Sequence, residues 1–259
     1  MSQEIFFTIV VATDNDENFV LPTLNSIKKQ TESSYEVIVI DGGSKDRTLE
    51  SVYKVPFTHR SLYTLFEPAT YYMWNKGLKM ARGRYILFFK AGTYFTSKYM
   101  LERLRSDIES LRDPDLVLTC GMGYHRKNRR LHTPPMSVRR LVRGILPTTL
   151  SSRIFRTQML RATGGFDTSF EVRASFDLMC RYVANPAVRL ASLSYVITDG
   201  MVNFSQKERF LEYHSETPRI MRQNFGWVKL MTYLVSHSTW IAFRYWLGNL
   251  HFHSADELG

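Results

Sequence analysis

The sequence predicts an α/β fold in which helices flank a mostly parallel sheet. Apolar runs rich in β-branched residues alternate with segments whose apolar residues recur at helical spacing, and short polar clusters separate the two. Strands that alternate with helices in this way are typical of βαβ units. With 259 residues, 44% of them hydrophobic and 22% charged, the chain has enough apolar side chains for one large domain.

The expected elements follow from the apolar pattern in chain order. Residues 6–13 form an apolar run with little alternation, which predicts a strand buried on both faces. Leu21, Leu24 and Ile27 then recur at helical spacing. We expect the remaining elements at strand 35–40, helix 47–53, strand 62–66, helix 72–80, strand 85–89, helix 100–111, strand 116–120, helix 176–183 and strand 188–197.

Charge and cysteine content narrow the partners and the compartment. The net charge of +10 favours anionic partners such as nucleotide phosphates or acidic lipid headgroups, although solubility alone also accounts for it. Basic segments at 125–130 and 139–143 are expected in a loop, but no nucleic-acid module accompanies them, so we expect no nucleic-acid partner. Cys120 and Cys180 form no ligand motif, and the N-terminus is not signal-like, which predicts a cytoplasmic protein.

The stretch YEVIVIDGGSKDRT, residues 35–48, ends a buried strand on a carboxylate and two glycines. Asp41 can accept an N–H of a nucleobase there, and Gly42 lets the backbone approach a flat ring or a phosphate. Ser44 can cap the following helix. An Asp-Gly turn without a ligand is the alternative. Because ligands bind beyond the carboxyl ends of parallel strands, we expect Asp14, Asp41 and Lys90 along one edge that faces a ligand.

The chain resembles family 2 glycosyltransferases of the GT-A fold through about residue 200. Four ordered motifs carry the resemblance, and together they are more specific than any one alone. They are Ala12–Asn15 after the first strand; Asp41, Gly42, Ser44, Asp46 and Thr48 after the second; Glu67, Pro68 and Asn75–Gly77 leading into Ala81, Gly83, Tyr85 and Ile86; and GGFD at 164–167.

The resemblance implies a function and a set of donor-binding residues. An inverting transferase would move a sugar from a nucleotide-sugar donor, expected to be a UDP-sugar, to a glycan or lipid-linked acceptor in bacterial surface polysaccharide synthesis. Thr13 and Asp41 would bind the nucleotide, with Gly42 and Ser44 in the supporting loop. Asn75 and Lys76 would lie near the donor from the facing helix.

The metal-binding position departs from the family pattern. The family usually follows its fourth strand with an Asp-x-Asp cluster that holds a divalent cation, whereas this chain has Lys90, Ala91, Gly92 and Thr93. Magnesium and manganese prefer carboxylate oxygens, so we predict no metal site here, and no cofactor. Lys90 would then stabilise the leaving diphosphate as a point charge, unless it is only a solvated lysine at a strand end.

The general base also departs from the pattern. Ser175 stands where the family usually places the carboxylate that deprotonates the acceptor. Asp177 is the remaining candidate, although an acid near a helix start is also favoured by the helix dipole. Both departures leave a second function open, in which a catalytically inactive relative binds nucleotide or glycan, or serves as a scaffold.

We expect two parts, a transferase-like domain over 1–200 and a helical extension over 201–259. Residues 230–243 carry no charged side chain but are fewer than the roughly 18 that a membrane-spanning helix needs. With the flanking aromatic residues, they predict a helix that lies on an anionic membrane at its inner face. The alternative is a helix that packs on the domain or on a second copy of the chain.

Overall fold

A computed structural model describes residues 4–65, 69–124, 130–133, 141, 149–200, 215–228, 230–231 and 233–234, with the backbone alone at 121–124 and 130–133. The first elements are β1 (Phe7–Thr13), α1 (Val20–Lys28), β2 (Tyr35–Asp41), α2 (Thr48–Tyr53), β3 (Arg60–Thr64), α3 (Thr70–Met80) and β4 (Tyr85–Lys90). There follow β5 (Thr93–Phe95), α4 (Met100–Ser110), β6 (Leu116–Tyr124), β7 (Arg130–Thr133), η1 (Leu150–Ser152), β8 (Arg153–Arg156), α6 (Thr157–Ala162), α7 (Ala174–Ala184) and β9 (Leu190–Gly200).

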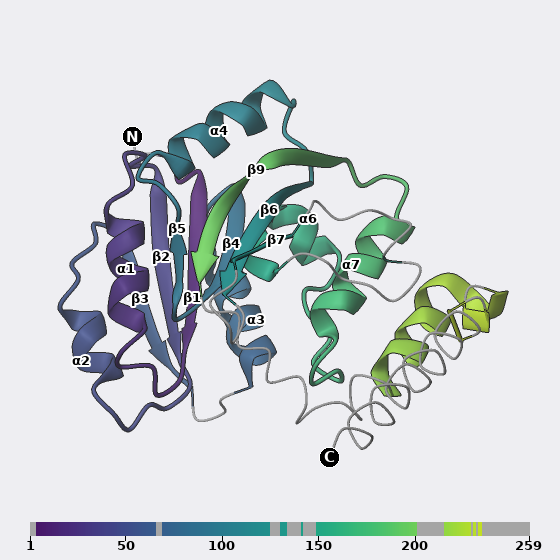
Figure 1. Ribbon diagram of the computed structural model, residues 1–259, viewed down its shortest axis with the longest axis horizontal. Coiled ribbons are helices and arrows are strands. Elements are labelled where there is room, and N and C mark those ends of the chain that lie inside the picture. The colour runs from purple at the N-terminus through teal and green to yellow at the C-terminus, as the bar shows by residue number, and fades with distance from the viewer. Residues whose placement is uncertain are drawn as a thin grey trace, which may run out of the picture.

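One sheet runs through the molecule in the order β3-β2-β1-β4-β8-β6-β9-β5, with β7 beside β6 (Figure 1). The first four strands are parallel neighbours, and β6 and β9 also pair in parallel. The α/β class predicted from the alternating pattern is confirmed. The antiparallel strand β8, inserted between β4 and β6, was not predicted and makes the second half of the sheet mixed.

The apolar runs form strands because both faces of the sheet are covered. Along β1, Phe7, Ile9 and Val11 belong to one core cluster, whereas Val10 and Ala12 belong to the other. Side chains of a strand alternate between faces, so a strand with two covered faces needs apolar residues at consecutive positions. The run at 6–13 therefore required no polar alternation.

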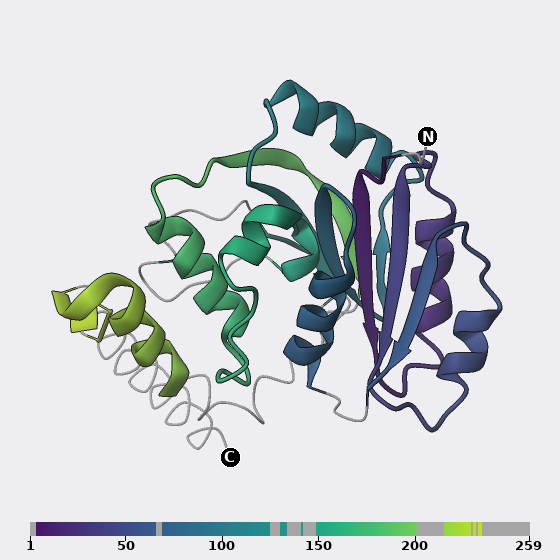
Figure 2. The ribbon, with the colours of Figure 1, turned by 180° about the vertical axis from the view of Figure 1, so that it is seen from behind.

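Helices α1, α2 and α4 cover one face, and α3, α6 and α7 contribute to the core on the other. Figure 1 shows α1 and α2 at one end of the sheet and α7 towards the other, and Figure 2 shows β1, β2 and β3 side by side from behind. At two positions, the chain packs so closely against β1 that only glycine fits. A Cβ on Gly77 of α3 would lie 2.4 Å from Val10 Cγ1, and one on Gly83 would lie 2.5 Å from the Thr8 backbone nitrogen.

The described C-terminal residues are helical and lie beside α7 (Figure 1). Glu216 accepts hydrogen bonds from three consecutive backbone N–H groups at the start of α7, those of Glu171, Val172 and Arg173, at 2.7–3.2 Å. These contacts fix the helix against the domain and give partners to backbone N–H groups of the segment that leads into α7, including that of Arg173, its N-cap. The predicted boundary at residue 200 stays a prediction, because residues 201–214 lie outside the described part.

No described helix combines the length and the apolar character that crossing a membrane requires. The two basic segments of the sequence, 125–130 and 139–143, fall almost wholly outside the described residues, and so does most of 230–243.

Candidate active site

A cleft of about 470 Å³ opens where β1 and β4 end. Ligand pockets commonly have volumes of about 300–1,000 Å³, and open parallel sheets bind ligands at this edge. Residues from several elements line it: Ala12, Thr13, Asp14, Asp16, Thr70, Met73, Trp74, Phe88, Lys90, Ala91, Thr93, Thr149, Leu150, Ser151, Asp199 and Gly200.

The strand register brings the predicted residues to one edge. Thr13 stands opposite Asp41 across β1 and β2, and Ala12 stands opposite Lys90 across β1 and β4. Thr13 and Lys90 line the cleft itself. The Thr13 hydroxyl donates to Asp16 Oδ2 at 3.3 Å, which ties the end of β1 to the loop that follows it.

Asp41 holds its own loop in place and is not among the described residues that line the cleft. Its Oδ2 accepts the backbone N–H groups of Gly43 and Ser44 at 3.0 and 3.1 Å, and its Oδ1 accepts the Ser44 hydroxyl at 2.5 Å. Gly43 has a φ of +92°, a conformation that favours glycine. Gly42 donates its backbone N–H to the Thr13 carbonyl at 2.8 Å. The motif therefore builds a fixed loop beside Thr13.

This loop is also joined to the one after β1. Ser44 Oγ accepts the backbone N–H of Asn15 at 2.9 Å, and Asn15 Oδ1 accepts that of Lys45 at 2.9 Å. Asn15 itself has a φ of +52°. The predicted helix-capping role of Ser44 is not seen, because α2 begins at Thr48 and the serine joins the two loops instead.

Three described carboxylates line the cleft: Asp14, Asp16 and Asp199. Burial raises the pKa of the Asp14 carboxyl, and the nearby charges of Asp16 and Asp41 raise it further. Asp199 ends β9, is 7% exposed, and accepts the backbone N–H of Gly200 at 2.8 Å. Asp199 was not predicted as a site residue, although it shares a feature with Asp41: both are acids followed by a glycine at the end of a strand.

Asn75 and Lys76 lie on α3 but are not among the described residues that line the cleft. The Asn75 side chain pairs with the backbone of Phe166, donating from Nδ2 to the carbonyl at 2.7 Å and accepting the N–H at 2.9 Å. The Lys76 ammonium lies over the Tyr63 ring, 5.7 Å from its centroid. Their predicted contact with a donor stays a prediction.

The position after β4 offers a cation where the family usually has carboxylates. Lys90 is the exposed end of an otherwise buried strand, and Ala91 and Thr93 line the cleft beside it. In the described parts of the chain, no group of three or more His, Cys, Asp or Glu side chains is arranged to hold a metal ion. The residues at this position do not fit a divalent cation, and no chemical step below uses one.

Asp177 faces a different cavity from Thr13 and Lys90. Its Oδ2 accepts from Arg181 Nε at 2.8 Å and its Oδ1 from Asn224 Nδ2 at 3.1 Å. It is 3% exposed and lies with Gly164 against a hollow beside the C-terminal helix. These contacts are structural, and the predicted role of Asp177 as a base stays a prediction.

Ser175 is held by a fully buried arginine from β8. Arg153 Nη1 donates to Ser175 Oγ at 2.8 Å. Burial lowers the pKa of the Arg153 guanidinium to about 9, against a smaller raising effect of Tyr71, so the group keeps its charge at neutral pH. Ser175, which stands where the resemblance leads us to expect the base, therefore accepts a hydrogen bond from the Arg153 guanidinium.

The family model for glycosyl transferase family 2 matches residues 8–169, more than half of the chain. The chain belongs to glycosyl transferase family 2. This glycosyltransferase is 24% identical over 216 residues to a PGL/p-HBAD biosynthesis glycosyltransferase of Mycobacterium bovis, covering 80% of its own length and 82% of the relative. It is 27% identical over 169 residues to the poly(ribitol-phosphate) beta-N-acetylglucosaminyltransferase TarS of Staphylococcus aureus, covering 60% of the chain and 28% of TarS.

Solved structures agree on the fold of this glycosyltransferase. It superposes on S. aureus TarS 1-349 in complex with UDP with a TM-score of 0.67 at 22% identity, covering 85% of this chain and 65% of that fragment. The mannosyltransferase PcManGT from Pyrobaculum calidifontis, in complex with GDP-Man and Mn2+, gives 0.58 at 16% identity, covering 93% and 82%. The GT-A fold that the sequence motifs predicted is confirmed.

Proposed function

We propose that this glycosyltransferase moves a sugar from a UDP-sugar to a glycan or lipid-linked acceptor of a bacterial cell surface, with inversion. The observation that carries the proposal is the cleft at the ends of β1 and β4, whose volume suits a nucleotide sugar. TarS, which shares the fold, has been solved with UDP and with UDP-GlcNAc. Among curated relatives, TarS is named as a poly(ribitol-phosphate) beta-N-acetylglucosaminyltransferase, and the mycobacterial enzyme as a PGL/p-HBAD biosynthesis glycosyltransferase.

The donor lies along the sheet edge in this proposal. The nucleoside sits at the ends of β1 and β2, beside Thr13 and the loop that Asp41 holds. The diphosphate lies at Lys90, whose ammonium offsets the negative charge that grows on the leaving group. Lysine serves phosphate as a point charge, so this role needs no carboxylate at that position.

The transfer is a direct displacement. An acceptor hydroxyl oxygen attacks the anomeric carbon, the bond from that carbon to the diphosphate oxygen breaks, and the nucleoside diphosphate leaves with the electron pair. Holding both substrates in the cleft supplies much of the rate, because the reaction no longer waits for a productive encounter. The proton of the hydroxyl passes to a base.

Two carboxylates compete for the role of base. Asp177 is the one predicted from the sequence, and Asp199 is one of the three described carboxylates that line the cleft, the one at the end of β9. Asp177→Asn and Asp199→Asn separate them when both are assayed for transfer and for thermal stability. Loss of kcat with an unchanged melting temperature identifies the base, whereas a variant that only melts earlier had a structural carboxylate.

The proposal is tested by measuring nucleoside diphosphate release. The full chain is incubated with UDP-glucose, UDP-galactose, UDP-N-acetylglucosamine or GDP-mannose and a bacterial glycolipid extract, with and without EDTA. We expect release from a UDP-sugar that survives EDTA and falls when Lys90 is changed to Met. Release that EDTA abolishes contradicts the metal-free reaction. Tight UDP binding without release from any donor favours the catalytically inactive alternative.

The C-terminal helix supports docking on an anionic membrane at its inner face. Trp227 and Val228 are 59% and 78% exposed, and Met231 and Leu234 are exposed on the following turns. The Arg222 guanidinium lies over the Trp227 ring at 4.8 Å, which places a cation beside the apolar side chains.

Co-sedimentation with phosphatidylglycerol and with phosphatidylcholine vesicles tests the docking. Binding should require the anionic lipid and weaken in Trp227→Ala but not in Tyr99→Ala, an exposed aromatic residue at the start of α4. A change in oligomeric state in Trp227→Ala, with no vesicle binding by the wild type, identifies a second copy of the chain as the partner.

A further inference from the structure

Trp74 lines the cleft, and the proposed function gives it no contact with the donor. It lies on the first turns of α3, is 7% exposed, and lines the cleft together with Thr70 and Met73. Its ring packs against those of Phe88, Phe166 and Tyr71, with centroids 5.9, 5.4 and 5.4 Å away. Aromatic contacts on this scale fix the position of the indole.

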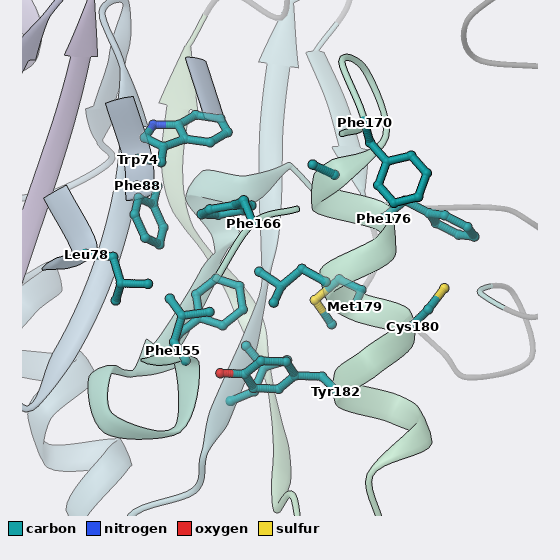
Figure 3. Packing of buried hydrophobic residues seen from close by; sticks show 14 of the residues in the cluster. Trp74, Leu78, Phe88, Phe155, Phe166, Phe170, Phe176, Met179, Cys180 and Tyr182 are labelled. Carbon is teal, nitrogen blue, oxygen red and sulfur yellow. The ribbon is translucent and has the colours of Figure 1, made fainter. Parts of the chain in front are cut away.

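The indole N–H of Trp74 has no hydrogen-bond partner among the described residues. A buried donor left unsatisfied costs about 1–3 kcal/mol, so such groups usually have a partner or a functional reason. Figure 3 shows the indole at the edge of the aromatic cluster, with its nitrogen on the side away from α7. The only chemistry that this nitrogen offers is donation to an acceptor oxygen.

The position of Trp74 along the sheet indicates which part of a donor it meets. The diphosphate of a nucleotide sugar joins the nucleoside to the sugar, and the proposed function places the nucleoside over β1 and β2 and the diphosphate at Lys90. Trp74 packs on Phe88 of β4, two residues before Lys90, and on Phe166, which belongs to the other half of the fold. The end of the donor beyond the diphosphate is the sugar.

We propose that Trp74 donates a hydrogen bond from its indole N–H to an oxygen of the transferred sugar and so contributes to the choice of sugar. The inference rests on the proposed function, since it needs a nucleotide sugar in the cleft. Selection follows from the same chemistry: a sugar that places an oxygen there gains a hydrogen bond, and a sugar without that oxygen does not. Trp74 thus acts on the sugar and not on the nucleotide.

Two-dimensional 1H–15N spectra of tryptophan-labelled protein test the inference without requiring catalysis. The chain has four tryptophans, and Trp74→Phe assigns the indole signal of Trp74 by its disappearance. We expect that signal to move when UDP-glucose, UDP-galactose or UDP-N-acetylglucosamine is added, and to move much less with UDP alone. Equal movement with UDP and with every UDP-sugar overturns the inference, as does no movement with any sugar donor while UDP binds.

Affinity measurements give the second readout. Loss of one hydrogen bond weakens binding by about three- to tenfold. Trp74→Phe should therefore lower the affinity for the preferred UDP-sugar by that factor and leave the affinity for UDP unchanged. Trp227→Phe, the same change at an exposed site, should leave both affinities unchanged. An unaltered ratio of UDP-sugar to UDP affinity in Trp74→Phe contradicts the role. If the wild type binds neither UDP nor any UDP-sugar, the proposed function itself fails and the inference falls with it.

Discussion

Replacing Asn75 with alanine should destabilise the protein by removing the clamp between α3 and the turn at 164–167. The amide makes two hydrogen bonds to the backbone of Phe166, at 2.7 and 2.9 Å, and Phe166 is only 2% exposed. Water therefore cannot replace the lost partner easily. Asn75→Ala leaves two backbone groups of Phe166 without a partner, and each costs about 1–3 kcal/mol, so we expect the free energy of unfolding to fall by about 2–6 kcal/mol.

Urea denaturation followed by circular dichroism measures this difference, since a shifted midpoint at an unchanged slope reports stability. Asn25→Ala is the matched control, because Asn25 also lies within a helix and its side chain makes no hydrogen bond in the described part of the chain. We expect the control to stay within about 0.5 kcal/mol of the wild type. Equal effects in the two variants refute the clamp. Unchanged stability with weakened UDP-sugar binding restores the prediction that Asn75 contacts the donor.

Three further perturbations follow from the structure. Gly83→Ala should prevent or severely weaken folding, measured by soluble yield and melting temperature, because its Cβ would lie 2.5 Å from the backbone nitrogen of Thr8. Glu216→Gln should lower the free energy of unfolding by about 1–3 kcal/mol, measured in urea, because hydrogen bonds from backbone N–H groups to an ionised carboxylate become bonds to a neutral amide. Asp14→Asn should raise stability at pH 7.5: a raised pKa means that ionised Asp14 costs stability above that pKa. The stability difference between Asp14→Asn and the wild type should narrow at pH 4.5. A difference that does not change with pH would contradict the raised pKa, which comes from burial and from the nearby carboxylates.

β1, β2 and β4 could be predicted from the sequence because they are covered on both faces. Apolar residues therefore fill most of their positions and form runs without polar alternation. β8 was not predicted as a strand, because an arginine stands at each of its ends and only two apolar residues lie between them. Arg153 is fully buried and donates a hydrogen bond to Ser175 of α7. A local pattern holds no information on a partner 22 residues away.

The candidate site divides in the same way. Asp14, Asp41 and Lys90 could be predicted to lie along one edge because the carboxyl ends of parallel strands share an edge. The contacts that each of these side chains makes at that edge could not be predicted. Asp41 turned out to hold its own loop, and Trp74 and Asp199 were recognised only once the cleft had brought them together.

Periodicity and ordered motifs were enough to predict the class of the fold and the family, because both are visible along the chain without knowing which residues meet in space. The hydrogen-bond partners of each side chain at the sheet edge followed from the packing of distant segments. Hydrogen-bond partners such as Asn75 and Phe166, 91 residues apart, are chosen by packing. Packing also decides whether a carboxylate faces a cleft, as Asp199 does, or a neighbouring helix, as Asp177 does.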